Sequence, residues 1–227
     1  NQTANALFGN AASVLVGDFL YSRAFQMMVL VGSMRIQQVL ADATNTIAEG
    51  EVLQLLNCHN ADVDIPQYLR VIRYKTAKLF EAASRLGAIL SGAPAEIEEG
   101  MARYGMHLGT AFQLVDDVLD YSGEEETTGK HLGDDLAEGK PTLPLIHAMK
   151  HGSATQSACV RHAIEEGGRD ALPGVLAAIR ATGALDETRR HAEAEARLAL
   201  AAVAPLPAST FKDSLVQLAS FAVARDF

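Results

Sequence analysis

The sequence has no tryptophan, 6% aromatic residues and only two cysteines among its 227 residues. Cys58 and Cys159 are isolated and form no metal-type spacing, so a cysteine zinc site is excluded and a reducing, cytoplasmic location is expected. No apolar run approaches the roughly 20 residues that a membrane-spanning helix needs. We therefore expect neither a transmembrane segment nor a signal peptide.

The sequence also lacks an excess of positive charge. Nineteen Lys and Arg residues face 28 Asp and Glu residues, which gives a formal net charge of −9. Nucleic-acid binding needs a basic face that displaces phosphate counterions, so general nucleic-acid binding is excluded. A small anionic substrate would have to be held locally, by metal ions or by a few well-placed cations.

Apolar residues make up 48% of the chain and recur with the period of an α-helix, while no pair of segments has the alternation typical of strands. This pattern predicts one all-α domain over residues 1–227. The most apolar stretch, Ala11 to Met34, is interrupted by charged residues and is predicted to be a buried helix. The predicted helices cover residues 11–31, 34–57, 66–90, 95–120, 141–151, 155–166, 170–182, 184–203 and 208–225.

Between two of these helices lies a segment of about 20 residues, near 121–140, that has no periodicity. Ordinary helix connections are shorter, so a segment of this length in a compact domain is typically functional. It contains Lys130 and Lys140, each beside a glycine that lets the backbone approach a ligand closely. Each lysine alone is most simply a solubilising residue, but together they suggest two cationic ligands that hold a diphosphate.

The helix before this segment carries several acidic residues on one side. If Asp116 is set at zero, the α-helical turn of about 100° per residue puts Asp120 at about 40°, Gln113 at about 60° and Asp117 at about 100°. Apolar residues occupy the opposite side, so a solvated polar face is the simplest alternative. However, residues 104–129 contain no Lys or Arg that would pair with these carboxylates.

Unpaired like charges about 4 Å apart repel by roughly 1 kcal/mol in water and by about 4 kcal/mol at an effective dielectric constant of 20. A divalent cation reverses the sign of that interaction. A few oxygen ligands, supplemented by phosphate oxygens and water, suit Mg²⁺ better than zinc or calcium. The carboxylate helix therefore predicts a magnesium site.

A further lysine, Lys75, lies on the inward side of the predicted helix 66–90, where burial is costly unless the charge is paired. Its side chain either reaches along the surface to water or binds a buried anion, and Thr76 beside it adds a hydroxyl donor. Glu49, Glu51 and Gln54 are candidate partners near the same pocket.

These segments resemble the trans-polyprenyl diphosphate synthases, and among them the octaprenyl diphosphate synthase type. The resemblance covers essentially the whole chain, and its last two motifs are highly specific. The matching motifs are GNAASVLVGDFLYSRAF (Gly9 to Phe25), AEGEVLQL (Ala48 to Leu55), KTAKLFEAA (Lys75 to Ala83), FQLVDDVLDY (Phe112 to Tyr121) and GKHLGDDLAEGKPTLPL (Gly129 to Leu145).

The resemblance implies an isoprenoid-synthase-type helical bundle around a central apolar cavity, with Mg²⁺ at its mouth. There an allylic diphosphate such as farnesyl diphosphate loses pyrophosphate, and the carbocation is captured by isopentenyl diphosphate. The implied product is a long-chain all-trans polyprenyl diphosphate, the precursor of a quinone side chain as in ubiquinone biosynthesis. The family also suggests a homodimer, and Ala11 to Met34 becomes either a wall of the elongation tunnel or ordinary packing.

Residue by residue, the resemblance implies three groups of site residues. Asp116, Asp117 and Asp120 form the second Asp-rich motif, with Asp116 the nearest metal ligand and Asp120 acting directly or through water. The allylic diphosphate is held by Lys75, Lys130 and Lys140. The reacting centre is lined by Thr76 and Gln113.

One feature departs from the family pattern. The family uses two facing Asp-rich motifs, and the first, with the arginines that follow it, is not found among these 227 residues. We therefore expect residues 1–227 alone to be inactive or severely impaired. A non-catalytic partner subunit of a heteromeric synthase is the alternative from another class, and a Mg²⁺-dependent diphosphatase is a third possibility.

Overall fold

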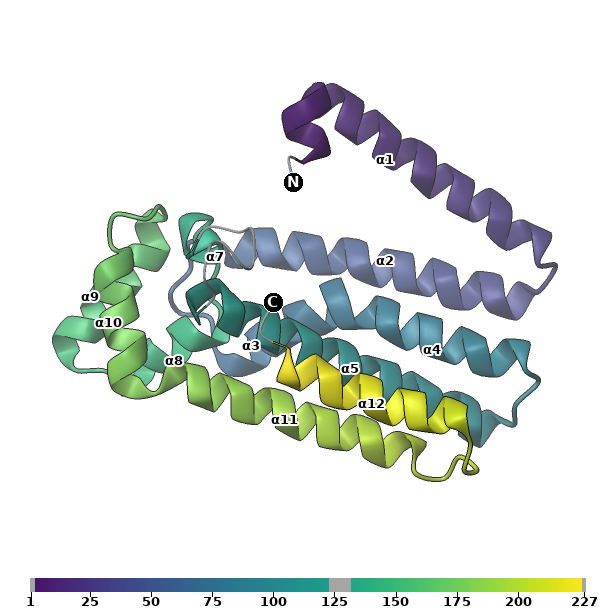
Figure 1. The fold of residues 1–227 in the computed structure, drawn as a ribbon. Coiled ribbons are helices and arrows are strands. Elements are labelled where there is room, and N and C mark those ends of the chain that lie inside the picture. Colours follow the sequence, from purple (N-terminus) through teal and green to yellow (C-terminus); the bar gives the residue numbers. More distant parts are fainter. Residues whose placement is uncertain (1–2, 123–131, 226–227) are drawn as a thin grey trace. The chain divides into compact units, whose positions relative to one another are not determined.

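The computed structural model describes residues 3–122 and 132–225. All regular elements among these residues are helices, so the predicted all-α class is confirmed (Figure 1). The elements are α1 (Ala4–Leu30), α2 (Met34–Asn57), α3 (Ile65–Ile72), the π-helical turn η1 (Arg73–Ala77), α4 (Lys78–Leu90), α5 (Ala95–Ser122), α7 (Asp134–Ala137), α8 (Leu143–His151), α9 (Ala154–Glu166), α10 (Leu172–Thr182), α11 (Ala184–Val203) and α12 (Thr210–Ala224).

Most predicted helix boundaries agree with the structure to within a few residues. The predictions for 34–57 and 184–203 coincide with α2 and α11. The start of α3 is fixed by a capping box, in which Asp64 accepts from the backbone N–H of Gln67 while the Gln67 side chain accepts from the backbone N–H of Asp64. Two features were not predicted: helix 66–90 is interrupted by η1, and the expected loop near 121–140 contains the short helix α7.

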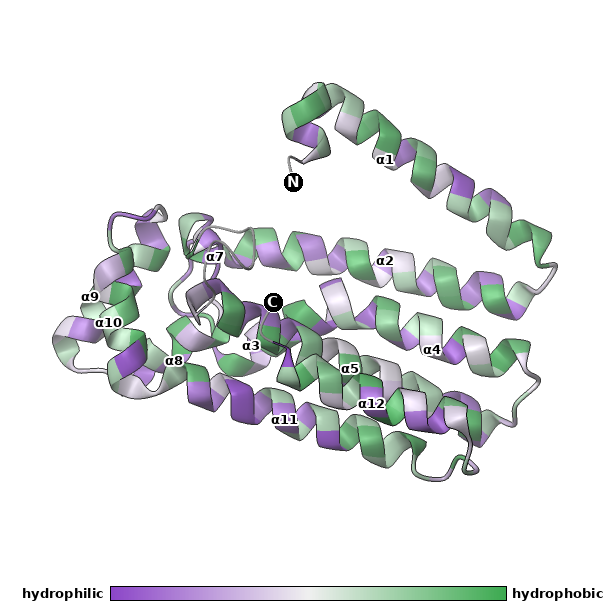
Figure 2. Cartoon of the chain, viewed as in Figure 1, coloured by the Kyte–Doolittle hydropathy of each residue, from purple (hydrophilic) through white to green (hydrophobic). Residues whose placement is uncertain are grey.

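The chain divides into two compact units, Asn1–Asp42 and Ala43–Phe227. The first contains α1 and the start of α2. Hydrophobic residues dominate α1 (Figure 2), yet Met28 is its one residue described as buried. The prediction of a buried helix over Ala11 to Met34 is therefore wrong for this segment apart from Met28. A helix that is apolar on all sides is buried only when it has neighbours on all sides, and within its own unit α1 has only the start of α2. None of the described helices combines the length and apolar character of a membrane span.

In the second unit, α5 packs along both α4 and α11 (Figure 1). One core cluster joins α8, α9 and α10, and a second joins α3, α5, α8 and α11. A third cluster joins α5, α11 and α12, where the buried Tyr104 hydroxyl donates to the carbonyl of Leu215 at 2.8 Å. The predicted apolar back of α5 is confirmed, since Leu108, Leu114 and Val115 are buried.

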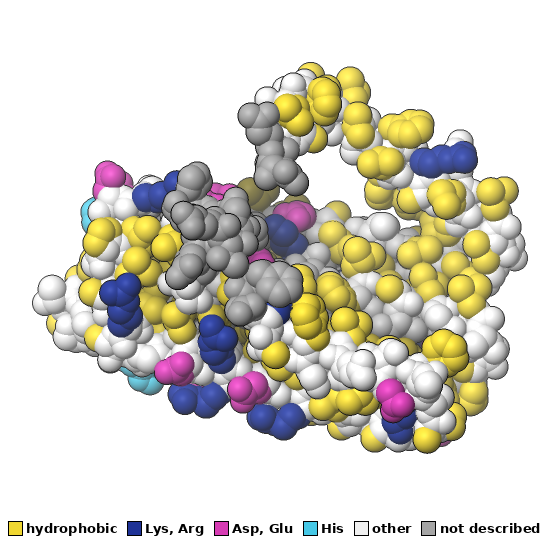
Figure 3. Space-filling view, viewed as in Figure 1, with side chains coloured by type: hydrophobic (Ala, Val, Ile, Leu, Met, Phe, Trp, Pro, Cys, Tyr) yellow, Lys and Arg dark blue, Asp and Glu magenta, His cyan; other side chains and the backbone are white. Residues whose placement is uncertain are grey.

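The outer side of α11 is polar. Basic and acidic side chains gather along it at the lower edge of Figure 3, while Ala192, Ala199 and Val203 on its inner side are fully buried. This division makes α11 an amphipathic helix whose inner side packs on the core.

The close approach of α4 and α5 depends on Gly105, because a Cβ atom there would lie 2.2 Å from the backbone oxygen of Phe80. We expect Gly105→Ala to lower the free energy of unfolding by about 3 kcal/mol, since backbone rather than a flexible side chain must move. Denaturant unfolding measures this change. The control is Gly87→Ala in α4, where a Cβ meets nothing within 4 Å and helix propensity predicts a gain of up to about 1 kcal/mol. Equal effects of the two substitutions would contradict the packing argument.

A pair of histidines on α8 predicts a pH dependence of stability. The rings of His147 and His151 stack with centroids 4.3 Å apart. Burial and the neighbouring His151 lower the pKa of His147, so the unfolded chain takes up a proton more readily than the folded one. The stabilisation is complete above the unfolded pKa of about 6.5 and is lost as the pH falls below it. We expect His147→Gln to reduce the fall in Tm between neutral and mildly acidic pH, whereas His162→Gln, which removes an exposed imidazole, should leave that fall unchanged.

Candidate functional site

A cavity of about 410 Å³ opens in the second unit, between the end of α2, the α3–η1 segment, the C-terminal part of α5 and the α7 region. All of the predicted site residues that the structure describes line this one cavity. They are Lys75, Thr76, Gln113, Asp116, Asp117, Asp120 and Lys140. The remaining predicted residue, Lys130, lies outside the described residues.

The π-helical turn η1 carries Lys75 and Thr76. A π-turn inserts one extra residue per turn and changes which side chains face inward, and such turns are frequent at functional sites. The turn is backed closely by α2 at Gly50, where a Cβ atom would lie 2.6 Å from the backbone nitrogen of Lys75. The glycine therefore allows α2 to support the backbone at Lys75 directly.

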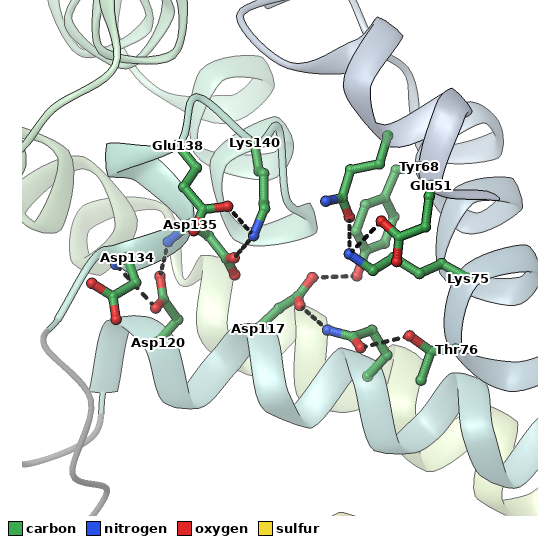
Figure 4. A network of polar contacts seen from close by, with 12 residues as sticks. Glu51, Tyr68, Lys75, Thr76, Asp117, Asp120, Asp134, Asp135, Glu138 and Lys140 are labelled. Atoms are coloured by element: carbon green, nitrogen blue, oxygen red, sulfur yellow. Dashed lines mark hydrogen bonds and ion pairs between the residues drawn. The ribbon is translucent and has the colours of Figure 1, made fainter. Parts of the chain in front are cut away.

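Lys75 is half-buried and has two polar partners on α2. Its Nζ donates to Oε1 of Gln54 at 3.1 Å and lies 3.1 Å from Oε2 of Glu51 (Figure 4). Two of the three partners suggested by the sequence are thus in contact with the lysine. The third, Glu49, instead accepts a hydrogen bond from Asn45 at 2.7 Å.

A chain of side-chain hydrogen bonds runs from Thr76 to α3. The Thr76 hydroxyl donates to Oε1 of Gln113 at 3.0 Å, and Nε2 of Gln113 donates to Oδ1 of Asp117 at 2.9 Å. The Tyr68 hydroxyl donates to Oδ2 of Asp117 at 2.6 Å, and Figure 4 shows these two side chains pointing toward one another. Burial raises the pKa of Asp117 well above its usual range, against the opposing effect of the two hydrogen bonds.

Asp120 lies at the other end of the cavity, where its carboxylate accepts hydrogen bonds from the N-terminus of α7. The backbone N–H groups of Asp134 and Asp135 donate to its two oxygens at 3.2 and 3.3 Å. Burial and the nearby charge of Asp135 raise the pKa of Asp120 to about 7. The carboxylates at this end of the cavity therefore repel one another, which is the condition that a cation would relieve.

Lys140 lies among carboxylates of the α7 region. Its Nζ is 3.1 Å from Oδ1 of Asp135 and 2.6 Å from Oε2 of Glu138 (Figure 4). Burial opposes the charged form, but the hydrogen bonds and charges of these two carboxylates raise the pKa of Lys140 above its usual value. The ammonium group is therefore held charged at the edge of the cavity.

Asp116 is partly exposed and lies close to the end of the described chain. Its Oδ1 is 3.7 Å from Nη2 of Arg225, a residue that is 8% exposed. The same guanidinium donates to the carbonyl oxygen of Phe112 at 2.8 Å and stacks over the Phe112 ring at 3.9 Å. The ion pair thus holds the first aspartate of the Asp-rich motif close to the residue that follows α12.

The donor set of the cavity fits a hard divalent cation. Asp116, Asp117 and Asp120 offer only oxygen atoms, and Mg²⁺ is commonly bound by one or two carboxylates together with phosphate oxygens and water. Within residues 3–122 and 132–225, no group of three or more His, Cys, Asp or Glu side chains is arranged as a complete metal cage. An ion held jointly by one or two of these carboxylates and a bound diphosphate does not require such a cage.

Sequence reasoning missed several contributors to the site, among them Tyr68, Asp135, Glu138 and Arg225. A signal existed for Tyr68, because it precedes Lys75 by seven residues and so falls near the same side of a helix. Asp135 and Arg225 contact the site through pairings that no helical spacing encodes.

Comparisons with known proteins point to one family. The Polyprenyl synthetase family model matches residues 1–179. The octaprenyl diphosphate synthase of Escherichia coli (strain K12) is 55% identical over 225 residues, covering 99% of this chain and 70% of that protein. The all-trans-nonaprenyl-diphosphate synthase (geranyl-diphosphate specific) of Rhodobacter capsulatus is 45% identical, covering 98% of this chain and 68% of that protein.

Solved structures agree with these sequence matches. The polyprenyl synthase of Caulobacter crescentus CB15, crystallised in complex with calcium and isoprenyl diphosphate, has a TM-score of 0.94 and 44% identity, covering 99% of this chain and 69% of that one. A decaprenyl diphosphate synthase from Rhodobacter capsulatus has a TM-score of 0.92 and 42% identity, covering 100% of this chain and 70% of that one. The predicted isoprenoid-synthase fold is therefore confirmed, and the chain belongs to the polyprenyl synthetase family.

Proposed function

We propose that this chain carries the catalytic body of a prenyltransferase that adds isopentenyl diphosphate units to an allylic diphosphate. The product is a long-chain all-trans polyprenyl diphosphate of the octaprenyl type. The family match and the names of the relatives support this reaction class. The observation that carries the proposal is that two lysines and three aspartates line one cavity of about 410 Å³.

Lys75 and Lys140 bind the diphosphate of the allylic substrate in this proposal. Each ammonium group is at the cavity and is held by oxygen acceptors of the protein. These partners keep the ammonium groups in place before substrate binds, so less conformational entropy is lost on binding. Lys130 is proposed as a third diphosphate ligand on the basis of the family motif.

Asp116 and Asp120 are proposed to hold Mg²⁺, with Asp117 behind them in the same motif. Bound there, the ion would offset the negative charge that develops on the departing diphosphate. The donor chemistry of the cavity supports an oxygen-ligated divalent ion, as does the calcium in the Caulobacter crescentus complex.

Ionisation of the allylic C–O bond separates charge within the cavity. Positive charge on Lys75 and Lys140 stabilises the leaving group, and the oxygen atoms of Thr76 and Gln113 line the reacting centre. The carbon–carbon bond then forms with isopentenyl diphosphate, and the departing diphosphate or a backbone carbonyl accepts the proton that is lost.

Three finer features extend the proposal: a homodimer, a product used as a quinone side chain as in ubiquinone biosynthesis, and a cytoplasmic location. We also propose that residues 1–227 by themselves turn over little substrate, because family members use a second, facing Asp-rich motif. Measurable condensation by the purified 227-residue chain would contradict that proposal.

A non-catalytic partner subunit is not favoured. The relatives that share 55% and 52% identity with this chain are themselves named octaprenyl diphosphate synthases. They are not named as accessory subunits.

The test is incubation of the protein expressed from the complete reading frame with farnesyl diphosphate, labelled isopentenyl diphosphate and Mg²⁺. Chromatography of the products should show chains longer than the primer by several five-carbon units. Release of pyrophosphate without longer chains would instead identify a diphosphatase and overturn the proposed transferase.

A further inference from the structure

The carboxylate of Asp117 differs from its two acidic neighbours because it is buried and two side chains, rather than backbone N–H groups, donate to its oxygens. The residue is 2% exposed, and Tyr68, which is 5% exposed, donates to Oδ2 while Gln113 donates to Oδ1. By contrast, the side chain of Asp116 is 33% exposed. These contacts suit Asp117 to orient other side chains rather than to bind an ion.

The hydrogen bonds have a direction that follows from the chemistry of each group. A carboxylate oxygen accepts, so the NH₂ end of the Gln113 amide faces Asp117 and the carbonyl end faces Thr76. The hydroxyl of Thr76 then donates its single proton to Gln113. Its lone pairs remain for whatever lies in the cavity, so Thr76 faces a ligand as an acceptor.

We infer that Tyr68 and Asp117 are positioning residues that fix the orientation of the Gln113 amide and thereby the acceptor character of Thr76 toward the cavity. This inference rests on the proposed function. A hydroxyl oxygen that faces the allylic carbon with its lone pairs stabilises the positive charge that develops there. Because the hydroxyl is already held in that orientation, it does not have to reorient when the charge appears. No bond or proton changes at Tyr68 or Asp117 themselves.

The placement of Tyr68 makes it the anchor of this chain of bonds. It is buried in the core cluster that joins α3, α5, α8 and α11, so its ring is held by packing on several sides. Its hydroxyl reaches from α3 to α5, across 49 positions of sequence. The phenol thus holds one oxygen of the carboxylate while Gln113 donates to the other.

The inference is tested with Tyr68→Phe and Thr76→Val, singly and combined, in the protein expressed from the complete reading frame. We expect Tyr68→Phe to lower kcat by about tenfold, with the KM values for both diphosphates changed by less than about threefold. Thr76→Val should lower kcat by a smaller factor in the Tyr68→Phe background than in the wild type, because residues of one network are coupled. Additive effects, or wild-type kcat in Tyr68→Phe, would overturn the inference.

Tyr104→Phe is the matched control for a merely structural effect. It also removes one buried tyrosine hydroxyl, whose hydrogen bond goes to the Leu215 carbonyl in a different core cluster. All rates are measured at a temperature where circular dichroism shows every variant folded. A similar loss of kcat in Tyr104→Phe and Tyr68→Phe would show that the loss comes from general destabilisation and would contradict the inference.

Two readouts do not depend on turnover. Calorimetry with Mg²⁺ and inorganic pyrophosphate should show a near-normal affinity for Asp117→Asn and an affinity at least tenfold weaker for Asp116→Asn. Equal losses of affinity would make Asp117 a ligand and contradict its positioning role. The ¹⁵N side-chain amide signal of Gln113 should shift in Tyr68→Phe and stay in place in Tyr104→Phe. If the wild type makes no prenyl product but this signal shifts as expected, the proposed function fails while the orienting network stands.

Discussion

Asp116→Ala is expected to lower the rate of prenyl condensation by at least about 10³-fold, because it removes the carboxylate proposed to lie nearest the metal ion and the diphosphate. The side chain is 33% exposed at the cavity and is close enough to Arg225 to form an ion pair. Its loss therefore has two consequences: the oxygen ligand disappears, and a buried guanidinium loses a charged partner. Steady-state kinetics with farnesyl and isopentenyl diphosphates measure the first consequence.

The two consequences can be separated. Asp116→Asn keeps a polar oxygen near Arg225 but removes the negative charge, so it should lose most of the activity while unfolding near the wild-type temperature. Asp62→Ala is the control for removal of an aspartate, since Asp62 is exposed and pairs with Arg161 at 2.7 Å. Near-normal turnover by Asp116→Ala would refute the metal assignment.

Lys75→Met should lower kcat by about 10²-fold or more, since an ammonium group aimed at a leaving group acts mainly as charge develops in the transition state. The Nζ atom is anchored by Gln54 and Glu51, and Gly50 brings α2 against the backbone beneath it. Without the lysine, the negative charge of Glu51, which lies 3.1 Å from Nζ in the wild type, is left without this partner and repels the diphosphate. The KM for the allylic substrate should rise as well.

Lys75→Arg separates charge from geometry. It retains the positive charge but replaces a compact ammonium group with a planar guanidinium group, so we expect kcat to recover only in part relative to Lys75→Met. Lys150→Met, at an exposed position near the end of α8, controls for the loss of one positive charge. If Lys75→Met bound Mg²⁺ and pyrophosphate and turned over substrate as the wild type does, Lys75 would have no part in diphosphate binding.

Local sequence alone determined most of the helices and the side of α5 that is buried. The period of apolar residues and the turn residues between segments are properties of neighbouring positions, which is why the bounds of α2 and α11 could be read directly. The same local geometry brought Asp116, Asp120 and Gln113 to one side of α5. It is also why the polar cavity-lining residues of that helix were identified in advance, although Leu119, predicted on the apolar side, lines the cavity too.

Only the tertiary structure decided what each of these side chains contacts. Asp117 was predicted to share the metal-binding acidic side of the helix, yet it is buried against Tyr68, and Asp116 lies near Arg225, more than 100 positions later in the chain. The π-turn at Arg73–Ala77 and the short helix α7 also lay beyond sequence reasoning. Each of these features depends on close packing between residues distant in sequence, and such pairings leave no periodic signal in the chain itself.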